Sequence, residues 1–133
     1  MVPDRARRPL HFIASSLADL RGVPVVVRGA FGRQLLDAQY GDTAASAKPL
    51  KGFGGASVLE LVEDDHSSTY RAVYTVRFER AVYVLHVFQK KSAKGVATSK
   101  GDMDLVRRRL QQAQRHYDQH DGRVETPKEG RNA

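Results

Sequence analysis

The chain has 133 residues, and its 22 Lys or Arg against 15 Asp or Glu give a formal net charge of +7. This length predicts a single domain over residues 1–121, followed by a flexible polar tail over 122–133. The absence of cysteine excludes disulfides and thiolate metal sites, and no apolar run approaches the ~18 residues of a membrane span. We therefore expect a soluble, cytoplasmic protein that does not enter a membrane.

The first part of the chain predicts a short strand and two helices. Residues 10–15 alternate in hydrophobicity as a strand does, and a short helix follows that ends at Gly22. A longer helix has Pro24 at its first position and closes at Gly41, which suits a left-handed helix end. Its apolar side chains recur every three or four residues and predict one buried stripe: Val27, Phe31, Leu35 and Ala38.

The middle of the chain predicts a loop and then three strands. Residues 41–55 are small, polar and rich in glycine, which is typical of a loop. The strands are predicted over 57–63, 69–78 and 81–89, where Val, Tyr and Phe are frequent.

The last two of these strands pair as a hairpin if Glu79 and Arg80 form a two-residue turn. The pairs in this register are Phe78 with Ala81, Tyr74 with Leu85, Ala72 with Val87 and Arg71 with Phe88. One face is then a core face: Tyr70, Ala72, Tyr74, Val76, Phe78, Ala81, Tyr83, Leu85 and Val87. The other face is mixed and half open to a ligand: Arg71, Val73, Arg77, His86 and Phe88.

The last predicted helix starts after one of two capping residues, Thr98 or Ser99, and Asp102 follows Ser99 as in a capping box. One stripe of this helix is apolar and faces the sheet: Met103, Val106, Leu110, Ala113 and Tyr117. The arginines of the helix then lie nearer to solvent: Arg107, Arg108 and Arg115. Together the elements indicate an α+β fold with a closing C-terminal helix.

Most of the net charge lies in one part of the chain. Residues 86–116 contain eight Lys or Arg against Asp102 and Asp104, so 8 − 2 = +6 of the total +7 lies there. A field of one sign attracts a polyanion such as a nucleic acid. A run of Lys and Arg is also typical of an ordinary solvated face, and composition alone does not separate the two interpretations.

Several classes of catalytic site have no support in the sequence. No GxSxG or HExxH motif is present, and the GFGG of residues 52–55 lacks the spacing of a phosphate-binding P-loop. The segment 51–55 is either a backbone nest for phosphate or a plain loop before a strand. His116 and His120 are four residues apart but have no third ligand nearby, so we predict no metal site.

The residue types that remain are cations and aromatic rings, which suit RNA. We expect four cations in and just after the predicted hairpin to converge on a phosphate: Arg71, Lys90, Lys91 and Lys94. Three rings lie close enough to stack on a base: Tyr70, Tyr74 and Phe88. RNA supplies its own 2′-hydroxyl nucleophile, so its cleavage requires neither a metal nor a carboxylate. An arginine stabilises the phosphorane, and a lysine crowded by other cations has a lowered pKa and serves as base or acid.

Three stretches of sequence carry a resemblance to a known family. They are PLKGFG before a strand, then YRAVY, then LHVFQKK before the closing helix. Over roughly residues 8–118 the chain resembles the phage-derived, HigB-like branch of the RelE/ParE toxin superfamily. This resemblance implies a RelE-like fold, in which a small antiparallel sheet with a mixed edge is flanked by N-terminal helices and a C-terminal closing helix.

The resemblance also implies a function. It implies the toxin of a type II toxin–antitoxin system, acting as a metal-independent, cofactor-free mRNA endoribonuclease on the translating ribosome and inhibiting translation. A helix-turn-helix antitoxin of the HigA type would silence it. Carried over by motif, the expected catalytic residues are Arg71, His86, Lys90, Lys91 and Lys94. We assign RNA binding to five further residues: Lys51, Tyr74, Phe88, Arg107 and Arg108.

Three points remain open. RelE-type ribonucleases often have a tyrosine or histidine near the chain end for stacking or proton transfer. Phe88 donates no proton, and Tyr70, Tyr74 and Tyr117 are all candidates for that role.

ParE-like members act on gyrase with the same fold, so a non-catalytic gyrase inhibitor or a phage accessory binding protein is the second interpretation. A general nucleic-acid binder that uses Arg107, Arg108 and Arg109 is the third.

Overall fold

The computed structural model describes residues 6–90 and 98–120. The predicted tail and two of the expected catalytic residues, Lys91 and Lys94, lie outside these ranges. The elements in chain order are β1 (Leu10–Phe12), α1 (Ser16–Gly22), α2 (Val25–Gln39), β2 (Lys48–Pro49), β3 (Val58–Asp65), β4 (Ser68–Thr75), β5 (Val82–Lys90) and α3 (Lys100–Gln119). Within these ranges no helix has both the length and the apolar character that crossing a bilayer requires.

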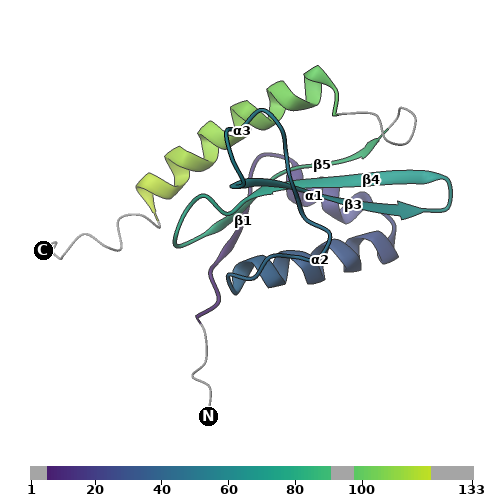
Figure 1. Ribbon diagram of the computed structural model, residues 1–133, viewed down its shortest axis with the longest axis horizontal. Coiled ribbons are helices and arrows are strands. Elements are labelled where there is room, and N and C mark those ends of the chain that lie inside the picture. The colour runs from purple at the N-terminus through teal and green to yellow at the C-terminus, as the bar shows by residue number, and fades with distance from the viewer. Residues whose placement is uncertain (1–5, 91–97, 121–133) are drawn as a thin grey trace, which may run out of the picture.

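The strands form one mixed sheet between two layers of helix. Its order in the described chain is β1-β5-β4-β3-β2, with β1 parallel to β5 and the other neighbours antiparallel. Figure 1 shows α1 and α2 on one side of the sheet and α3 on the other. The α+β class, the N-terminal helices, the mixed edge and the closing helix are therefore as predicted.

The core between the sheet and α2 is built on the predicted stripe of α2. Val27, Phe31, Leu35 and Ala38 are each at most 1% exposed. They pack against inward-facing residues of β3, β4 and β5: Leu59, Leu61, Ala72, Tyr74, Val82, Val84 and Val87. Pro24 is the N-cap of α2 and not its first helical residue, so the helix begins one residue later than predicted. Gly41 follows the helix with a φ of +84°, which glycine adopts easily.

A second core joins the other face of the sheet to α3. Val106, Leu110 and Ala113 are buried there, with Met103 and Tyr117 packed at the two ends of the same stripe. Ser99 is the N-cap of α3, and its hydroxyl accepts a hydrogen bond from the Asp102 amide at 3.1 Å. The stripe and the cap are both as predicted.

The predicted hairpin turn between β4 and β5 is wrong. β4 ends at Thr75 and β5 begins at Val82, so a longer connection replaces the two-residue turn at Glu79 and Arg80. Arg71 lies opposite Phe88 and Ala72 opposite Val87, as predicted. Beyond them the register shifts between Val73 and Tyr74, and Tyr74 pairs with Val84 instead of Leu85.

This bulge changes which side chains share a face. An extra residue in one strand breaks the alternation of inward and outward side chains. Leu85 and His86 are consecutive in β5, yet Leu85 packs in the α3 core and His86 bonds to α3. Tyr83 also packs against α3, on the face opposite to the predicted one. The face that we expected to be half open is instead covered by α3, and the end of β5 lies beneath the first turn of this helix.

Candidate functional site

The first cluster of the candidate site surrounds Arg71 in β4. Its Nη1 donates a hydrogen bond to Glu60 Oε2 at 3.0 Å, and both side chains are only 11–12% exposed. Thr98, just before α3, donates to the same carboxylate oxygen at 3.0 Å, and its hydroxyl lies 3.4 Å from Arg71 Nη1. The neighbouring strand β3 therefore fixes the guanidinium, and the start of α3 covers it.

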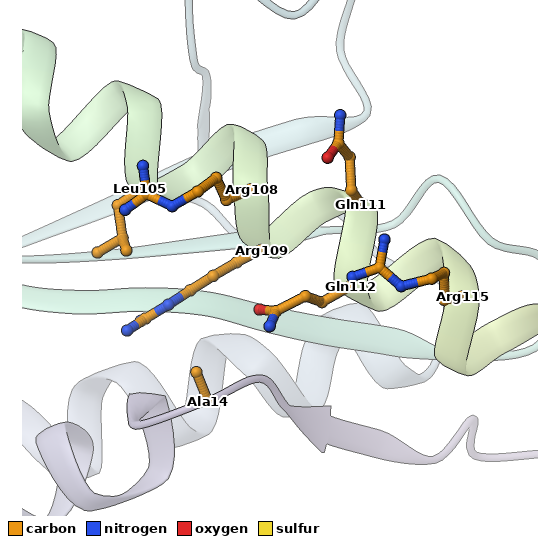
Figure 2. A pocket seen from close by; sticks show the side chains of 7 residues that line it. All are labelled: Ala14, Leu105, Arg108, Arg109, Gln111, Gln112 and Arg115. Carbon is orange, nitrogen blue, oxygen red and sulfur yellow. The ribbon is translucent and has the colours of Figure 1, made fainter.

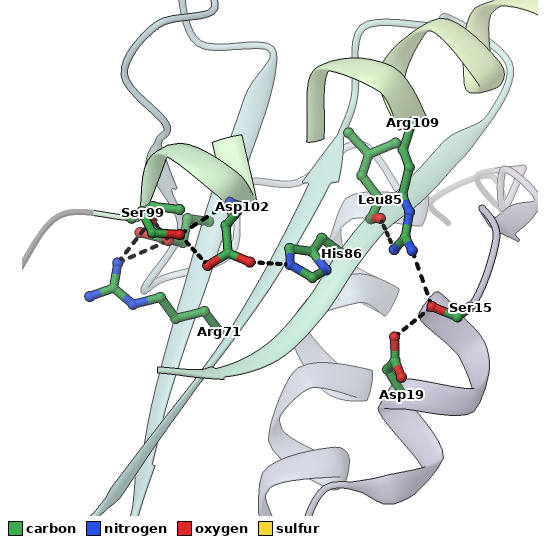
Figure 3. A network of polar contacts seen from close by, with 10 residues as sticks. Ser15, Asp19, Arg71, Leu85, His86, Ser99, Asp102 and Arg109 are labelled. Atoms are coloured by element: carbon green, nitrogen blue, oxygen red, sulfur yellow. Dashed lines mark hydrogen bonds and ion pairs between the residues drawn. The ribbon is translucent and has the colours of Figure 1, made fainter. Parts of the chain in front are cut away.

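The second cluster fastens α3 to β5. His86 Nε2 lies 2.8 Å from Asp102 Oδ1 in the first turn of α3, as Figure 3 shows. The other carboxylate oxygen accepts a hydrogen bond from Ser99 Oγ at 2.8 Å. The His86 ring is stacked on Phe88, with centroids 4.3 Å apart and planes 15° apart. His86 is thus enclosed between a strand neighbour and the helix.

The environment sets the charges of this pair. Burial lowers the pKa of His86, and this effect outweighs the opposing influence of the Asp102 carboxylate. Burial would raise the pKa of Asp102, but hydrogen bonds from His86 and Ser99 and the charge of Lys90 together lower it. A neutral imidazole therefore donates Nε2–H to an ionised carboxylate, which leaves a lone pair on Nδ1. Within residues 6–90 and 98–120 the buried Nδ1 has no hydrogen-bond partner.

Lys90 completes the set of cations at the end of β5. Its side chain is 8% exposed, and strand alternation places it on the same face as Phe88 and His86. Because Arg71 lies opposite Phe88, Lys90 is its diagonal neighbour across the strand pair. The structure thus brings together three of the five expected catalytic residues, Arg71, His86 and Lys90, whereas Lys91 and Lys94 lie outside the described residues.

Sequence reasoning did not identify Glu60 and Asp102 as part of this site. Glu60 was one of the acidic residues that alternate along a predicted strand, and Asp102 was assigned only to the capping box. The sequence did contain a signal for Asp102. It lies in the first turn of the last helix, and because that helix was predicted to pack on the sheet, its first-turn carboxylate would lie over a strand. For Glu60 the missing information was the strand register, which brings it beside Arg71.

The expected role of Tyr74 in RNA binding is a misassignment. Its side chain is 1% exposed, and burial followed by the charge of Asp37 raises its pKa to about 12. Alternation along β4 places Tyr70 and Tyr74 on the α2 side of the sheet, opposite to the face of Arg71. Tyr117 lies toward the far end of α3, where its ring stacks on Phe78 at 4.7 Å. Of the rings considered, Phe88 alone is part of the cluster at His86.

The arginines of α3 divide into exposed and anchoring residues. Figure 2 shows Arg108, Arg109 and Arg115 around a hollow of about 380 Å³ between α3 and the turn at Ala14. Arg109 is an anchor, because it donates to the Leu85 carbonyl at 3.0 Å and to a serine hydroxyl of the β1–α1 turn at 3.1 Å. Arg107, Arg108 and Arg115 are exposed, as predicted.

Two other predicted features lie away from the cluster. Lys51 is exposed in the loop between β2 and β3. The His116 and His120 rings stack with centroids 4.2 Å apart, and His116 Nδ1 lies 2.7 Å from the Tyr83 hydroxyl. No group of three or more His, Asp or Glu in the described part of the chain is arranged to hold a metal ion.

Comparison with known proteins gives both a family and a fold. A family model described as "Phage derived protein Gp49-like" matches residues 18–111. A double arginine-to-alanine mutant of the E. coli toxin RelE in the free state shares 19% identity, with 80% of this chain and 98% of that chain covered and a TM-score of 0.51. The isolated E. coli RelE toxin gives 22% identity, 76% and 97% coverage and a TM-score of 0.49.

A third solved structure is the RelBE2 toxin–antitoxin complex of Mycobacterium tuberculosis, with 19% identity, 68% and 100% coverage and a TM-score of 0.39. No protein with a curated description matches the sequence. At 19% identity the likeness to the free RelE mutant shows a common fold.

Proposed function

Because the chain belongs to the phage-derived Gp49-like family, we propose that it is the toxin of a toxin–antitoxin pair and that it cleaves mRNA on the ribosome. The observation that carries the proposal is the family match on a RelE fold, since fold alone does not determine function. The buried pair of cations, Arg71 and Lys90, supplies the charge that such a reaction needs.

The proposed reaction is an internal transesterification. The 2′-oxygen attacks the adjacent phosphorus, the bond from phosphorus to the 5′-oxygen breaks, and a 2′,3′-cyclic phosphate and a 5′-hydroxyl result. Arg71 and Lys90 stabilise the additional negative charge of the phosphorane, which in a site with little water is worth more than in bulk solvent. Two protons must also move: one leaves the 2′-hydroxyl and one joins the departing 5′-oxygen. We expect Lys91 and Lys94, which belong to the basic block of the motif, to accept and donate them.

For His86 the geometry supports a positioning role. Its neutral ring is stacked on Phe88 and bonded to Asp102, so it holds the start of α3 over the cations. Entry of a phosphate beside Arg71 would replace the hydrogen bond to Thr98, which lies next to the N-cap of the same helix. Attachment of α3 and access to Arg71 are therefore linked in the proposed mechanism.

The proposal includes two macromolecular partners. The translating ribosome presents the message, and the exposed arginines of α3 contribute a sequence-independent attraction to RNA phosphates. A helix-turn-helix antitoxin of the HigA type would neutralise the toxin, as the motif resemblance implies. An adjacent gene for such a protein, whose co-expression restores growth, is the expected genetic arrangement.

The test is cleavage of a defined message in a purified translation system. Wild-type protein should produce new 5′ ends that primer extension maps within the translated region. Arg71→Ala and Lys90→Ala should each reduce the cleavage rate by at least about 100-fold, the typical cost of one transition-state charge contact. Arg33→Ala removes one positive charge from the exposed face of α2, on the side of the sheet away from α3, and serves as the matched control. An intact message on actively translating ribosomes would refute the proposal.

One observation favours a second function. Arg71, His86 and Lys90 are each at most 9% exposed, which suits a structural network in a protein that binds without catalysis. A gyrase inhibitor on the same fold would have this property. It predicts that the purified chain inhibits DNA supercoiling while RNA remains intact, and unchanged gyrase activity would exclude it.

A further inference from the structure

We propose that a hollow on the side of α3 binds one unstacked base of a single-stranded RNA. The hollow has a volume of about 300 Å³ and is lined by Phe53, Arg77, Arg107, Leu110, Gln111 and Gln114. These residues come from the loop between β2 and β3, from the segment after β4 and from the middle of α3. The inference rests on the proposed function, because the base would belong to the same strand as the cleaved phosphate.

Gly52 explains why the loop lies so close to α3. Its φ of +99° is a conformation that residues with a side chain rarely adopt. A Cβ at this position would lie 3.2 Å from both Arg107 Nη2 and Met103 Cε. The loop thus approaches α3 as closely as glycine permits, and it brings the next residue, Phe53, to the rim of the hollow.

Phe53 and Arg107 form a stacking pair at this rim. The guanidinium carbon of Arg107 lies 5.4 Å from the centre of the Phe53 ring, within the range of a cation–π contact. Asp104 accepts a hydrogen bond from Arg107 at 3.3 Å, which holds the guanidinium on this side of the helix. Aromatic rings and arginine planes are the two groups on which proteins stack unpaired RNA bases.

The other lining groups suit the remaining parts of a nucleotide. Leu110 contributes an apolar floor, while Gln111 and Gln114 are exposed, one turn apart and able both to donate and to accept hydrogen bonds at a base edge. Arg77 is exposed at the β4 side, where its Nε lies 3.4 Å from Ser57 Oγ, and it provides a positive charge for a phosphate.

The opposite flank of α3 differs in one respect that matters. The hollow beside Arg108, Arg109 and Arg115 contains cations and glutamines but no aromatic ring. Gln111 lies between the two hollows and lines both of them, and Figure 2 shows its side chain leaving α3 in a direction different from that of Arg109. That side can attract phosphates but offers no ring for a base.

The hollow is also placed to share a strand with the candidate site. Arg107 follows Asp102 by five residues, which is about 7.5 Å along the helix axis. In the proposed arrangement one single strand has a phosphate beside Arg71 and the base of a nearby nucleotide beside Phe53. Selection of a base at this position would give cleavage a sequence preference.

The experiment measures binding with a probe that cannot be cleaved. A labelled 2′-O-methyl oligoribonucleotide lacks the nucleophile, and a fully abasic strand of equal length has the same phosphates without bases. Fluorescence anisotropy at one salt concentration gives Kd for both strands with the full-length protein. The wild type should prefer the base-bearing strand by about tenfold or more, which is the usual gain from stacking one base.

Two variants test the assignment. Phe53→Leu keeps an apolar side chain without a stacking ring, and Arg107→Lys keeps the charge without the guanidinium plane. Each should reduce the preference for bases to less than about threefold while leaving the affinity for the abasic strand unchanged. Arg115→Lys, on the opposite flank, should retain the full preference. If Phe53→Leu lowers the melting temperature, the result for Arg107→Lys decides whether the hollow binds a base, because Arg107 is exposed and its replacement does not disturb the core.

Several outcomes overturn the inference. They are equal affinity of the wild type for the two strands, absence of binding to either strand, and a preference for bases that survives in both variants. The message-cleavage assay is scored separately. Cleavage without a base preference contradicts the hollow alone, and a base preference without cleavage contradicts the proposed catalysis alone.

Discussion

The hydrogen bond between Asp102 and His86 should be a major contributor to the attachment of α3. In Asp102→Ala the buried His86 Nε2–H loses a charged partner at 2.8 Å, and a hydrogen bond to a charged group contributes about 1.5–3 kcal/mol. The variant also loses a carboxylate from the first turn of the helix, which contributes about 0.3–1 kcal/mol. Because Asp102 is 32% exposed, hydrogen bonds to water replace part of the lost interaction energy. We therefore expect the free energy of unfolding to fall by about 2 kcal/mol.

The pKa shifts give this prediction a pH dependence with a definite sign. Burial lowers the pKa of His86, so below its ordinary value of 6.5 the unfolded chain binds a proton that the folded chain does not. The free energy of unfolding therefore falls as the pH drops from 6.5 toward the lower folded value. The lowered pKa of Asp102 acts in the same direction at more acidic pH, below its ordinary value of 3.8.

The assay is urea unfolding followed by far-UV circular dichroism at about pH 7.5 and about pH 5.5, above and below the value of 6.5 at which the His86 transition begins. His86→Gln removes that transition, so its stability difference from the wild type should shrink at the lower pH. In a double-mutant cycle, Asp102→Ala and His86→Gln should show a coupling of at least about 1 kcal/mol. Asp104→Ala, two residues further along α3, is the matched control; it loses only exposed ion pairs and should cost less than about 1 kcal/mol. Additive losses, without coupling, would refute the reasoning.

Three further predictions concern the packing around α3 and α2. Gly52→Ala should cost roughly 1–3 kcal/mol from its positive φ and its close contact with α3. Gly54→Ala shares a positive φ, of +71°, but meets no neighbouring atom, and it should cost less in the same thermal melts. Arg109→Ala should lower stability by about 1–2 kcal/mol because it loses two anchoring hydrogen bonds, and equal melting of Arg108→Ala and Arg109→Ala would contradict this. Val25 is 73% exposed, so Val25→Ser should change stability by less than about 0.5 kcal/mol, and a larger loss would show that its side chain packs against the fold.

The helices were predictable because their apolar periodicity coincides with what they bury. The stripes of α2 and α3 were placed residue by residue, and each packs as expected on its own side of the sheet. The bulge in β5 was not predictable, because nothing in AVYVLHVFQ determines which residue remains unpaired. Its consequence is large, since one extra residue moves Tyr83 and Leu85 to the opposite face.

For the candidate site, the sequence identified the cations but not the carboxylates that hold them. Arg71, His86 and Lys90 meet in one cluster, whereas Glu60 and Asp102 required a strand register and a helix position to be known. Tyr74 was misassigned although the predicted register already placed it on the core face, where it is buried. The phage-derived family is confirmed by the family match and the RelE-like fold by the likeness to the free RelE mutant, and RNA cleavage stays a prediction.

The parallel pairing of β1 with β5 has a consequence for biosynthesis. Leu10 pairs with Val82, so the first strand made waits for one of the last before it gains a neighbour in the sheet. Contacts so distant in sequence slow folding, and the ribosome delivers residues one at a time. The nascent chain therefore cannot assemble Arg71, Lys90 and α3 until synthesis is almost complete. A chain with the proposed activity would thus become harmful only after its own translation has nearly ended, which leaves an interval in which a partner already present can bind it.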